Sequence, residues 1–433
     1  MIKTDLRGKK LLLVGGLNTT ADLTHLAKRN GVLLGVADYN HGTLLKGLSD
    51  FAYDTDAYDE EAMVSLCRKE HIDGVITAFN ERLGPVVRRL ADRMGYYAPF
   101  SVEQLKMSTD KSFFKHTCMK YGVPVPKEYN VTDENDTESS DIDFPVIVKP
   151  VDNASSVGVT PCYDVKSLKE AYKRAISNSR SGNVIVEKYL PYDEINMTYI
   201  AQDGDIQLAA VHDRYFNREQ DSYVNAPDLY IYPSRYTDLI LEKYDAAIRN
   251  MLEKIGVKNG SLFIQAVVNG DKMYCYEAGM RLNGCKTYQI LERENGYNTF
   301  EHLMEYALTG SMGEHCRFDP RFSKWYATIN VLGKPGADIA RYCGEEELNS
   351  YPWLIHIAKR YREGDSIPAG CEGTLIQDTT RIHVEANAKD ELMERIDKVN
   401  ELYKILDKDN KNIILKPHDT KEVLRGLDYE LGV

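Results

Sequence analysis

The sequence predicts a protein of mixed α/β and α+β class, with an N-terminal parallel sheet, a central α+β region and a small C-terminal α+β domain. Three observations predict this class. The first hundred residues alternate apolar runs with helical segments, later apolar segments pair as hairpins, and 433 residues are enough for two or three domains. Apolar residues make up 43% of the sequence, which excludes a largely disordered chain.

The N-terminal block consists of repeated strand and helix signals. Strands are predicted at 9–14, 32–37 and 74–78, and helices near 20–29, 59–70 and 85–94. Strands separated by helical segments of about ten residues imply parallel pairing, because the chain must cross over between them. Residues 95–101 mark the end of this block, and we predict a first domain at 1–105.

The central block mixes helices with antiparallel strand pairs. A helix is predicted from Thr109 to Tyr121, followed by strands at 144–149 and 183–189 and by hairpins at 195–212 and 261–278. The segment 132–143 holds six acids and no base, so we expect an exposed loop there. We predict a domain at 106–315, divided into 106–190 and 191–315, and a C-terminal domain at 316–433 with a helix near 390–406.

Charge and cysteine content exclude several classes of protein. The sequence has 54 basic and 66 acidic residues, a formal net charge of −12, which argues against binding to nucleic acid or to an anionic membrane. Its eight cysteines form no CxxC pair, so we expect reduced thiols in a cytoplasmic compartment and no zinc site. We find no apolar stretch of 18 residues and therefore expect no membrane span.

Three local features each suggest contact with phosphate. Asp110 and Lys111 open a helix, where free N–H groups and a lysine favour an anion. An apolar strand ends in Lys149, and the loop 152–158 is built of small residues whose N–H groups and serine hydroxyls can surround phosphate oxygens. Taken singly, each feature also fits an ordinary surface helix or turn.

A fourth feature points to adenine and a fifth to a metal. The strand end Glu187–Leu190 can bind an adenine edge through its backbone, with apolar atoms around the ring. Gln265 and Glu277 lie twelve residues apart on the two strands of a predicted hairpin, and oxygen ligands so placed can bracket Mg²⁺. Arg281 follows and could neutralise a transferring phosphoryl group, although a solvent-facing hairpin with an unrelated arginine fits the same residues.

The order of these features resembles the ATP-grasp superfamily and is similar to its biotin carboxylase, carbamoyl-phosphate synthetase and carboxylate–amine ligase members. The resemblance covers about residues 10–310. It implies an ATP-grasp fold with a pre-ATP sheet and a ligase forming C–N bonds, which activates a carboxylate as an acyl phosphate and joins it to an amine. The implied cofactors are ATP and Mg²⁺, with Mn²⁺ as an alternative metal. The implied partners are a small-molecule carboxylate and amine, and dimers are common in this architecture.

The resemblance also assigns roles to individual residues. Lys111 on the helix and Lys149 on the strand would bind the α- and β-phosphates of ATP. The loop that contains Ser155, Ser156 and Gly158 would close over the β- and γ-phosphates. The adenine hinge comprises Glu187, Lys188, Tyr189 and Leu190, and Glu194 would contact the ribose. The metal ligands would be Gln265 and Glu277, and Arg281 would stabilise the acyl phosphate.

Two departures and an unassigned acceptor side leave alternatives open. Gln265 is an amide where the family has an acid, and Gly279 stands where an asparagine is often found, so Asn283 is a further candidate metal ligand. On the acceptor side, Arg214 is a candidate for binding a substrate carboxylate, with a surface arginine as the equal alternative. His212 is more simply a structural histidine than a general base.

Three other functions are weighed against the ligase. One is activation of bicarbonate, as in the carboxylases. Another is a nucleotide-binding regulatory protein with a degraded metal site, which the departures at Gln265 and Gly279 suggest. The third is an NAD-dependent oxidoreductase, suggested by the turn at Gly15 and by Asp38 after the second strand, although no GxGxxG motif is present.

Overall fold

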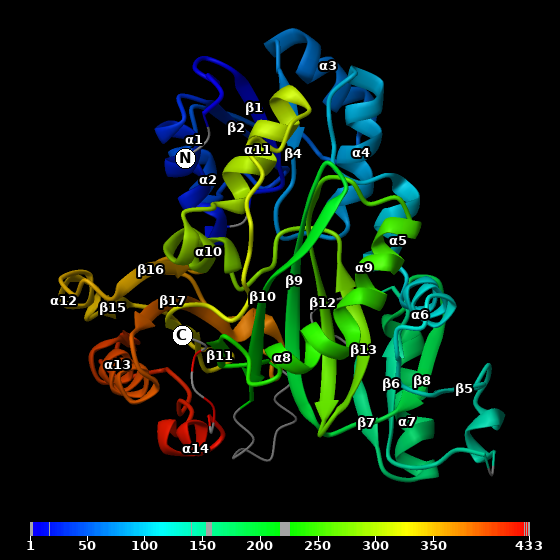
Figure 1. The fold of residues 1–433 in the computed structure, drawn as a ribbon. Helices are drawn as coiled ribbons and strands as arrows, with labels where there is room; N and C mark the ends of the chain where they lie inside the picture. Colours follow the sequence, from blue (N-terminus) through cyan, green and yellow to red (C-terminus); the bar gives the residue numbers. More distant parts are fainter. Residues whose placement is uncertain are drawn as a thin grey trace.

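The computed structural model describes residues 3–16, 18–139, 141–152, 158–216, 226–427, 429 and 431. In these residues the strands form an N-terminal four-stranded sheet, a second four-stranded sheet, an eight-stranded sheet and a two-stranded sheet. Figure 1 shows the N-terminal sheet at one end of the long central sheet, the second four-stranded sheet beside the other end, and the C-terminal helices on the opposite flank.

The N-terminal sheet is parallel throughout, which confirms the predicted crossover units. Its strand order is β3-β2-β1-β4, with β1 at Lys10–Val14, β2 at Leu33–Ala37, β3 at Phe51–Tyr53 and β4 at Gly74–Ile76. The helices between and after them are α1 (Asp22–Arg29), α2 (Leu44–Leu48), α3 (Glu60–Glu70) and α4 (Leu83–Met94). Leu11 and Leu12 are both fully buried although they point to opposite faces, as expected for a parallel sheet covered on both sides.

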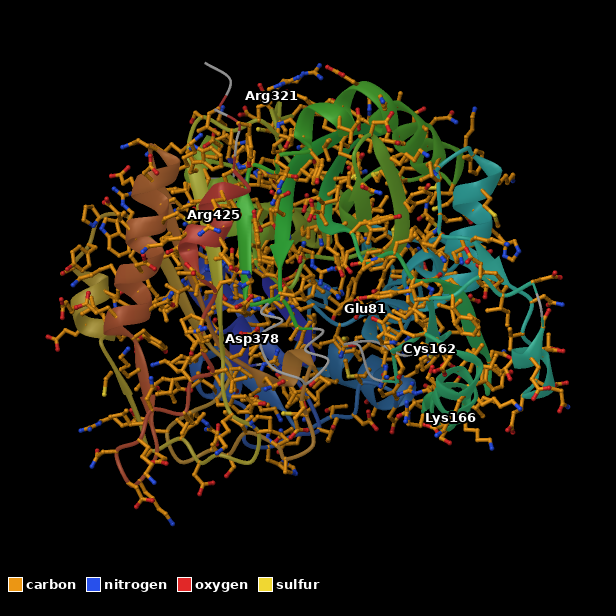
Figure 2. The ribbon with its side chains drawn as sticks, turned by 90° about the horizontal axis from the view of Figure 1, so that it is seen from below. Glu81, Cys162, Lys166, Arg321, Asp378 and Arg425 are labelled. Atoms are coloured by element: carbon orange, nitrogen blue, oxygen red, sulfur yellow. The ribbon has the colours of Figure 1, made fainter. Side chains whose placement is uncertain are left out.

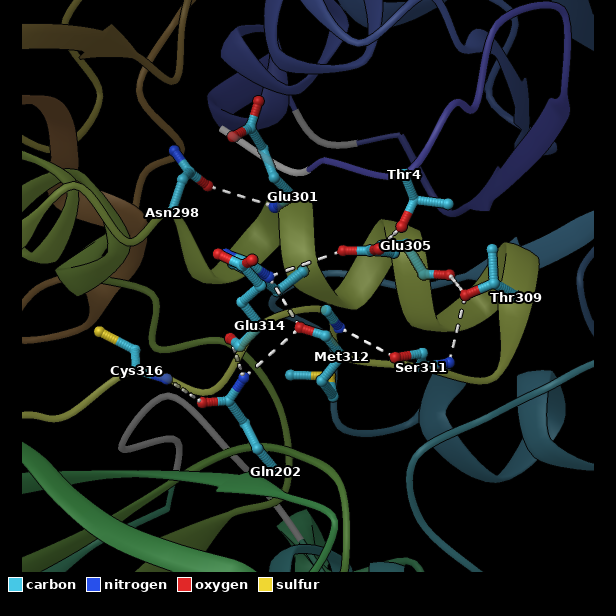
Figure 3. Close-up of polar contacts among 12 residues, drawn as sticks. Thr4, Gln202, Asn298, Glu301, Glu305, Thr309, Ser311, Met312, Glu314 and Cys316 are labelled. Carbon is cyan, nitrogen blue, oxygen red and sulfur yellow. Dashed lines mark hydrogen bonds and ion pairs between the residues drawn. The ribbon is translucent and has the colours of Figure 1, made fainter.

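Helix α11 (Thr299–Thr309) covers this N-terminal sheet although it comes from the middle of the chain (Figure 1). Asn298 caps it by accepting hydrogen bonds from the N–H groups of Phe300 and Glu301, and Glu305 near its other end accepts one from Thr4. The turn that follows α11 is held to the central sheet, since Gln202 donates to the carbonyl of Glu314 at 2.9 Å (Figure 3). The α11 segment therefore joins the two sheets.

The second four-stranded sheet is antiparallel, in the order β5-β8-β6-β7. Its strands are β5 (Glu128–Tyr129), β6 (Val146–Pro150), β7 (Thr160–Cys162) and β8 (Val184–Lys188). One face packs against α7 (Val165–Asn178) through Val148 and Val186. Because side chains alternate along a strand, Lys149 and Glu187 lie on the other face.

Two predicted details of this region are corrected. The helix expected from Thr109 to Tyr121 is α6 (Lys111–Lys120), which begins after Asp110 because this residue is its N-cap and accepts from the N–H of Phe113 at 3.0 Å; a separate helix, α5 (Val102–Thr109), precedes it. The acidic segment 132–143, expected as an exposed loop, is largely exposed in its described residues but contains a short 3₁₀ helix at Asn135–Glu138 with Thr137 buried.

The eight-stranded sheet has the order β13-β12-β9-β10-β11-β14-β17-β16 and is antiparallel. Its strands are β9 (Asp193–Gln202), β10 (Asp205–Tyr215), β11 (Leu229–Tyr232), β12 (Gly260–Asn269), β13 (Lys272–Gly279), β14 (Trp325–Leu332), β16 (Leu354–Lys359) and β17 (Asp378–Ala386). Strands β14, β16 and β17 come from the predicted C-terminal domain but continue the sheet of the central block. The domain boundaries themselves stay a prediction.

The remaining elements surround this sheet. They are η1 (Asn18–Thr20), α8 (Thr237–Leu239), a π-helix (Ile240–Tyr244), α9 (Asp245–Lys254), α10 (Thr287–Asn295), α12 (Glu345–Asn349), η4 (Leu375–Gln377), α13 (Lys389–Leu402), α14 (Thr420–Arg425) and the strand pair β15 (Arg341–Cys343) and β18 (Lys404–Leu406). Among the described residues, the helices are all too short or too polar to cross a membrane.

The two faces of the eight-stranded sheet differ in chemistry. On β9, Ile195, Met197 and Tyr199 belong to the apolar core that packs against α9, and the same face of β17 packs against α13. The alternate residues of β9, such as Asn196 and Thr198, point to the opposite side. We call this second side the polar face, and it carries most of the candidate site.

Candidate functional site

A buried ionic cluster lies on the face of the second four-stranded sheet that is opposite α7. Glu187 of β8 pairs with Lys149 of β6, and its other oxygen lies 2.9 Å from Nζ of Lys115 on α6. The side chains of Glu187 and Lys115 are only 3% and 2% exposed. We call these three residues the lysine–glutamate cluster. Lys149 and Glu187 were expected at the site, whereas Lys115 was not.

The cluster keeps its glutamate charged. Burial acts to raise the pKa of Glu187, but the ammonium groups of Lys149 and Lys115 outweigh burial and lower the pKa. A buried acid held by two cations fixes the position of both lysines. In sequence, the one available sign of Lys115 is its place four residues after Lys111, one helical turn further along α6.

Lys149 also connects this sheet to the eight-stranded sheet. Its Nζ lies 5.1 Å from the centre of the Tyr276 ring on β13, a cation–π contact. Tyr276 directly precedes Glu277 in the sequence. The lysine expected to bind phosphate therefore lies close to the residue expected to bind the metal, although the two come from different sheets.

The predicted metal ligands are neighbours on the polar face. Gln265 of β12 and Glu277 of β13 are directly paired in the strand register, at a bulge between Gln265 and Ala266. In the part of the chain that the structure describes, neither side chain forms a hydrogen bond, and no group of three histidine, cysteine or acidic residues could hold a metal by itself. One carboxylate and one amide oxygen are hard ligands that suit Mg²⁺ when a nucleotide supplies further oxygens.

The structure explains why position 279 is a glycine, and it gives Asn283 a structural role in place of the suggested role as a metal ligand. A Cβ at Gly279 would lie 2.2 Å from the ring of Phe263, its partner in the register, so a side chain such as asparagine does not fit there. Asn283 uses its side-chain oxygen to accept from the N–H of Cys285 at 3.1 Å. Its amide nitrogen has no partner among the described residues, and a donor group does not bind a cation.

Glu194, expected to contact a ribose, forms a three-membered network. Arg214 donates to Glu194 at 2.7 Å, and the hydroxyl of Tyr276 donates to the same oxygen at 2.6 Å. Burial raises the pKa of Tyr276 well above its usual value, which keeps the hydroxyl protonated as a donor. Arg214 thus orients Glu194, while direct binding of a substrate carboxylate by Arg214 stays a prediction.

Arg281 lies between the N-terminal sheet and the polar face. Its guanidinium pairs with Glu81, which follows β4, and lies 5.0 Å from the centre of the Phe263 ring. Its Nε has no hydrogen-bond partner among the described residues. Figure 2 shows Glu81 toward the middle of the molecule, whereas Lys166 lies nearer its edge. Glu81 carried no distinguishing sequence signal.

The remaining residues predicted to bind phosphate are Lys111, Gly158 and the two serines of the loop. The N–H of Lys111 approaches the carbonyl of Val151 at 3.5 Å, which places the start of α6 beside the end of β6. Gly158 has φ = +80°, a conformation that favours glycine. Ser155 and Ser156 lie outside the described residues.

The hinge residues differ from one another in orientation. The ammonium of Lys188 lies 2.9 Å from Asp143 on the α7 side of the sheet and so does not join the lysine–glutamate cluster. The N–H of Tyr189 donates to the carbonyl of Pro145 at 3.0 Å. Adenine contacts from the backbone of Glu187–Leu190 stay a prediction.

The polar face carries many buried polar atoms that have no hydrogen-bond partner among the described residues. They are Oδ1 of Asn196, Oγ1 of Thr198, Nδ1 of His212, Oγ1 of Thr328, Nε of Arg381 and Nδ1 of His383. Because buried polar groups in proteins are nearly always hydrogen-bonded, this surface is suited to a polar ligand. The sequence did not reveal it, since these residues come from four strands that are far apart in the sequence.

The buried histidines of this face are neutral. Burial lowers the pKa of His212 well below its usual value, and burial together with nearby His356 lowers that of His383 to about 3. Nε2 of His383 contacts the carbonyl oxygen of Cys285 at 2.9 Å. His212 packs against the Tyr232 ring at a centroid distance of 4.5 Å, which favours the structural interpretation of this residue.

The turn after β1 does not have the arrangement that NAD binding requires. Asp38 accepts a hydrogen bond from the N–H of Gly16 at 2.7 Å and another from Asn40 at 2.8 Å. The carboxylate that would contact a ribose is therefore used to shape the turn. This geometry disfavours the oxidoreductase alternative.

Sequence comparisons find a family model and several curated proteins that are similar to parts of the chain. The family model described as "D-ala D-ala ligase C-terminus" matches residues 118–259. A carbamoyl phosphate synthase large chain from Clostridium acetobutylicum is 24% identical over 270 residues, which is 60% of this chain and 24% of that protein. A D-alanine–D-alanine ligase from Trichlorobacter lovleyi is 26% identical over 250 residues, covering 56% of this chain and 75% of the relative. The match to the first of these relatives thus spans about a quarter of its length.

Structural comparisons cover nearly the whole chain. An L-amino acid ligase from Bacillus licheniformis has a TM-score of 0.74 at 16% identity, covering 93% of this chain and 99% of that one. The ADP complex of an N5-carboxyaminoimidazole ribonucleotide synthetase has a TM-score of 0.71 at 17% identity, covering 91% and 97%. At such identities the likeness establishes the fold alone.

Proposed function

The chain belongs to the ATP-grasp superfamily, and from this premise we propose that it is a Mg²⁺-dependent ligase that joins a carboxylate to an amine. The observation that carries the proposal is the meeting of Lys149 with Tyr276, beside the paired Gln265 and Glu277. A phosphate-binding lysine and a metal-binding pair at one place are what phosphoryl transfer from ATP requires. A cytoplasmic location and a homodimer remain predictions.

The chemistry proceeds in two steps. A carboxylate oxygen of the first substrate attacks the γ-phosphorus of ATP, the bond to the β-phosphate oxygen breaks, and ADP leaves. The amine nitrogen of the second substrate then attacks the acyl carbon, the bond to the phosphoryl oxygen breaks, inorganic phosphate leaves and the nitrogen loses a proton. The net products are an amide, ADP and phosphate.

The residues of the chain contribute mainly position and charge. Lys149, held in place by Glu187, would neutralise phosphate oxygens, and Arg281 would stabilise the charge that develops on the transferred group. Magnesium bound at Glu277 and Gln265 would supply further charge neutralisation to the phosphates. The contact of Arg281 with Glu81 must open for this arginine to reach a phosphoryl group.

Labelled oxygen tests the proposed order of steps. A coupled ADP-release assay over pairs of carboxylates and amines identifies active substrates, and one active carboxylate is then prepared with ¹⁸O. Because the carboxylate oxygen becomes the bridging oxygen of the acyl phosphate, we expect one ¹⁸O in the released phosphate, measured by mass spectrometry. Unlabelled phosphate together with normal amide formation would contradict the acyl-phosphate step.

The same assay decides between the alternatives. ADP release that requires bicarbonate and no other carboxylate would favour the bicarbonate-activating function. ATP binding without ADP release for any pair would favour the regulatory protein, for which the uncharged Gln265 is the specific observation.

A further inference from the structure

Two arginines contact the same residue, Asp378, at the end of the polar face that is remote from the metal pair. Arg381 of β17 is 7% exposed, and its Nη2 lies 2.6 Å from Oδ2 of Asp378. Arg360, directly after β16, donates from Nε to the main-chain oxygen of Asp378 at 2.9 Å. Among the described residues, this is the one hydrogen bond that the guanidinium of Arg360 forms, and Arg381 has no partner for its Nε. We call Arg360 and Arg381 the arginine pair.

The arginine pair carries an uncompensated positive charge. Two guanidinium groups remain charged at all ordinary pH values, whereas Asp378 supplies a single negative charge. Burial lowers the pKa of Arg360, and the neighbouring Arg381 lowers it further, so the two cations disfavour one another. The nearby His383 is neutral and adds polar atoms but no charge. An anion would balance the pair.

The segment 280–286 connects this pair to the phosphoryl-transfer end. The segment follows β13 directly and includes Arg281 near its start. Gly284 lies beside Arg381, since a Cβ at Gly284 would be 3.5 Å from Nη1 of that arginine. Three residues span at most about 11 Å between Cα atoms. Arg281 and Arg381 are therefore within one small-molecule length of each other along this segment.

Residues that follow strands of the N-terminal sheet contact both Arg360 and Arg281. Asn18, in the turn after β1, donates from its side chain to the main-chain oxygen of Arg360 at 2.9 Å. Glu81, the partner of Arg281, follows β4 of the same sheet. Ligands of parallel sheets bind at the carboxyl ends of the strands, and this edge extends from Glu81 to Asn18. A second substrate lying along the edge has one end at Arg281 and the other at the arginine pair.

We propose that Arg360 and Arg381 form a subsite for an anionic group, a carboxylate or a phosphate, carried by the amine substrate at the end opposite its reacting nitrogen. This inference rests on the proposed function for the identity of the substrate. The binding of a small anion by the arginine pair can nevertheless be measured without turnover.

The test is calorimetric titration of inorganic phosphate and, separately, of succinate into the full chain saturated with MgADP, which occupies the nucleotide phosphate sites. We expect one of the two anions to bind, and its identity gives the class of the acceptor's anionic group. Arg360→Met and Arg381→Met should each weaken that binding about tenfold or more, because each removes charged hydrogen bonds. Arg341→Met, an exposed arginine bonded to Asn410, is the control and should bind as the wild type does.

Two outcomes would overturn the subsite. One is the absence of millimolar binding of either anion to the wild type, and the other is unchanged binding in Arg360→Met. Arg381→Met leaves buried Asp378 without its cation and can lose its fold, whereas Arg360 contacts Asp378 only through the main chain, so the Arg360 variant remains decisive. Failure of MgADP to bind would count against the proposed function, and normal MgADP binding without anion binding would count against the subsite alone.

Discussion

The two ends of the site hold buried charge in different ways. At the nucleotide end, the lysine–glutamate cluster places one buried acid between two lysines in direct contact. At the other end, both members of the arginine pair contact Asp378 but only Arg381 pairs with its carboxylate, and polar atoms without partners among the described residues lie around them. The nucleotide end therefore holds its lysines in place by its own contacts, whereas the acceptor end needs a ligand to complete its hydrogen bonds. Substrate specificity is expected to reside at the acceptor end.

Removing Lys149 should have the largest effect, because it breaks the nucleotide end directly. In Lys149→Ala we expect ADP formation to fall by on the order of 100-fold or more, since a charge that faces the transferring phosphates is lost. Glu187 keeps Lys115 as a partner, so circular dichroism should show an intact fold. Lys166→Ala, an exposed lysine on α7, is the matched control. Near-normal turnover in Lys149→Ala would refute the role of this lysine.

Changes at the metal pair should have the next largest effect. We expect Glu277→Gln to lower ADP formation by about 10- to 100-fold and to raise the Mg²⁺ concentration for half-maximal rate, because the site loses its carboxylate. Gln265→Glu should lower that concentration by adding a charge. The measurement is the initial rate against Mg²⁺, with exposed Glu253→Gln as the control. A rate insensitive to both changes would favour the degraded metal site.

Lys115→Met sharpens the comparison, because it removes one of the two cations that hold Glu187. We expect the KM for ATP to rise several-fold with little change in kcat, since Lys149 loses part of its support but still reaches the phosphates. With one cation fewer, Glu187 protonates at higher pH than in the wild type, so the rise in KM should grow as pH falls. Lys120→Met, exposed at the end of the same helix, should behave as the wild type. An effect on kcat alone would contradict this positioning role.

The smallest effect concerns stability at the acceptor end. Burial and Lys286 lower the pKa of His356 from 6.5 to about 4, so the unfolded chain binds more protons than the folded one between these values. Stability should therefore decrease as pH falls from 6.5 to 4, and His356→Asn should reduce this decrease. Urea unfolding at several pH values measures it, with exposed His71→Asn as the control. An identical pH dependence in His356→Asn and the wild type would contradict the assignment.

The elements that carry the proposed nucleotide site were largely predictable from the sequence, because its residues stand at strand and helix ends that local patterns reveal. Lys149 closes an apolar run, and Gln265 and Glu277 flank a recognisable hairpin turn, which the register confirms. Lys115 escaped prediction since its burial depends on how α6 packs against another sheet. The arginine pair was not predicted because its two residues are brought together only by tertiary structure. Arg360 and Arg381 become neighbours only through the pairing of β16 with β17, and no local pattern encodes that pairing.

The continuity of the eight-stranded sheet determines where the chain can be cut. A fragment ending near residue 315 would lack β14, β16 and β17, and β11 would become an edge strand with unpaired backbone groups. Such an edge invites pairing with other chains, so we expect that fragment to aggregate. The four-stranded sheet with α7 shares no strand with the larger sheet. It is therefore the natural unit for exchange between relatives when chimeric enzymes are built.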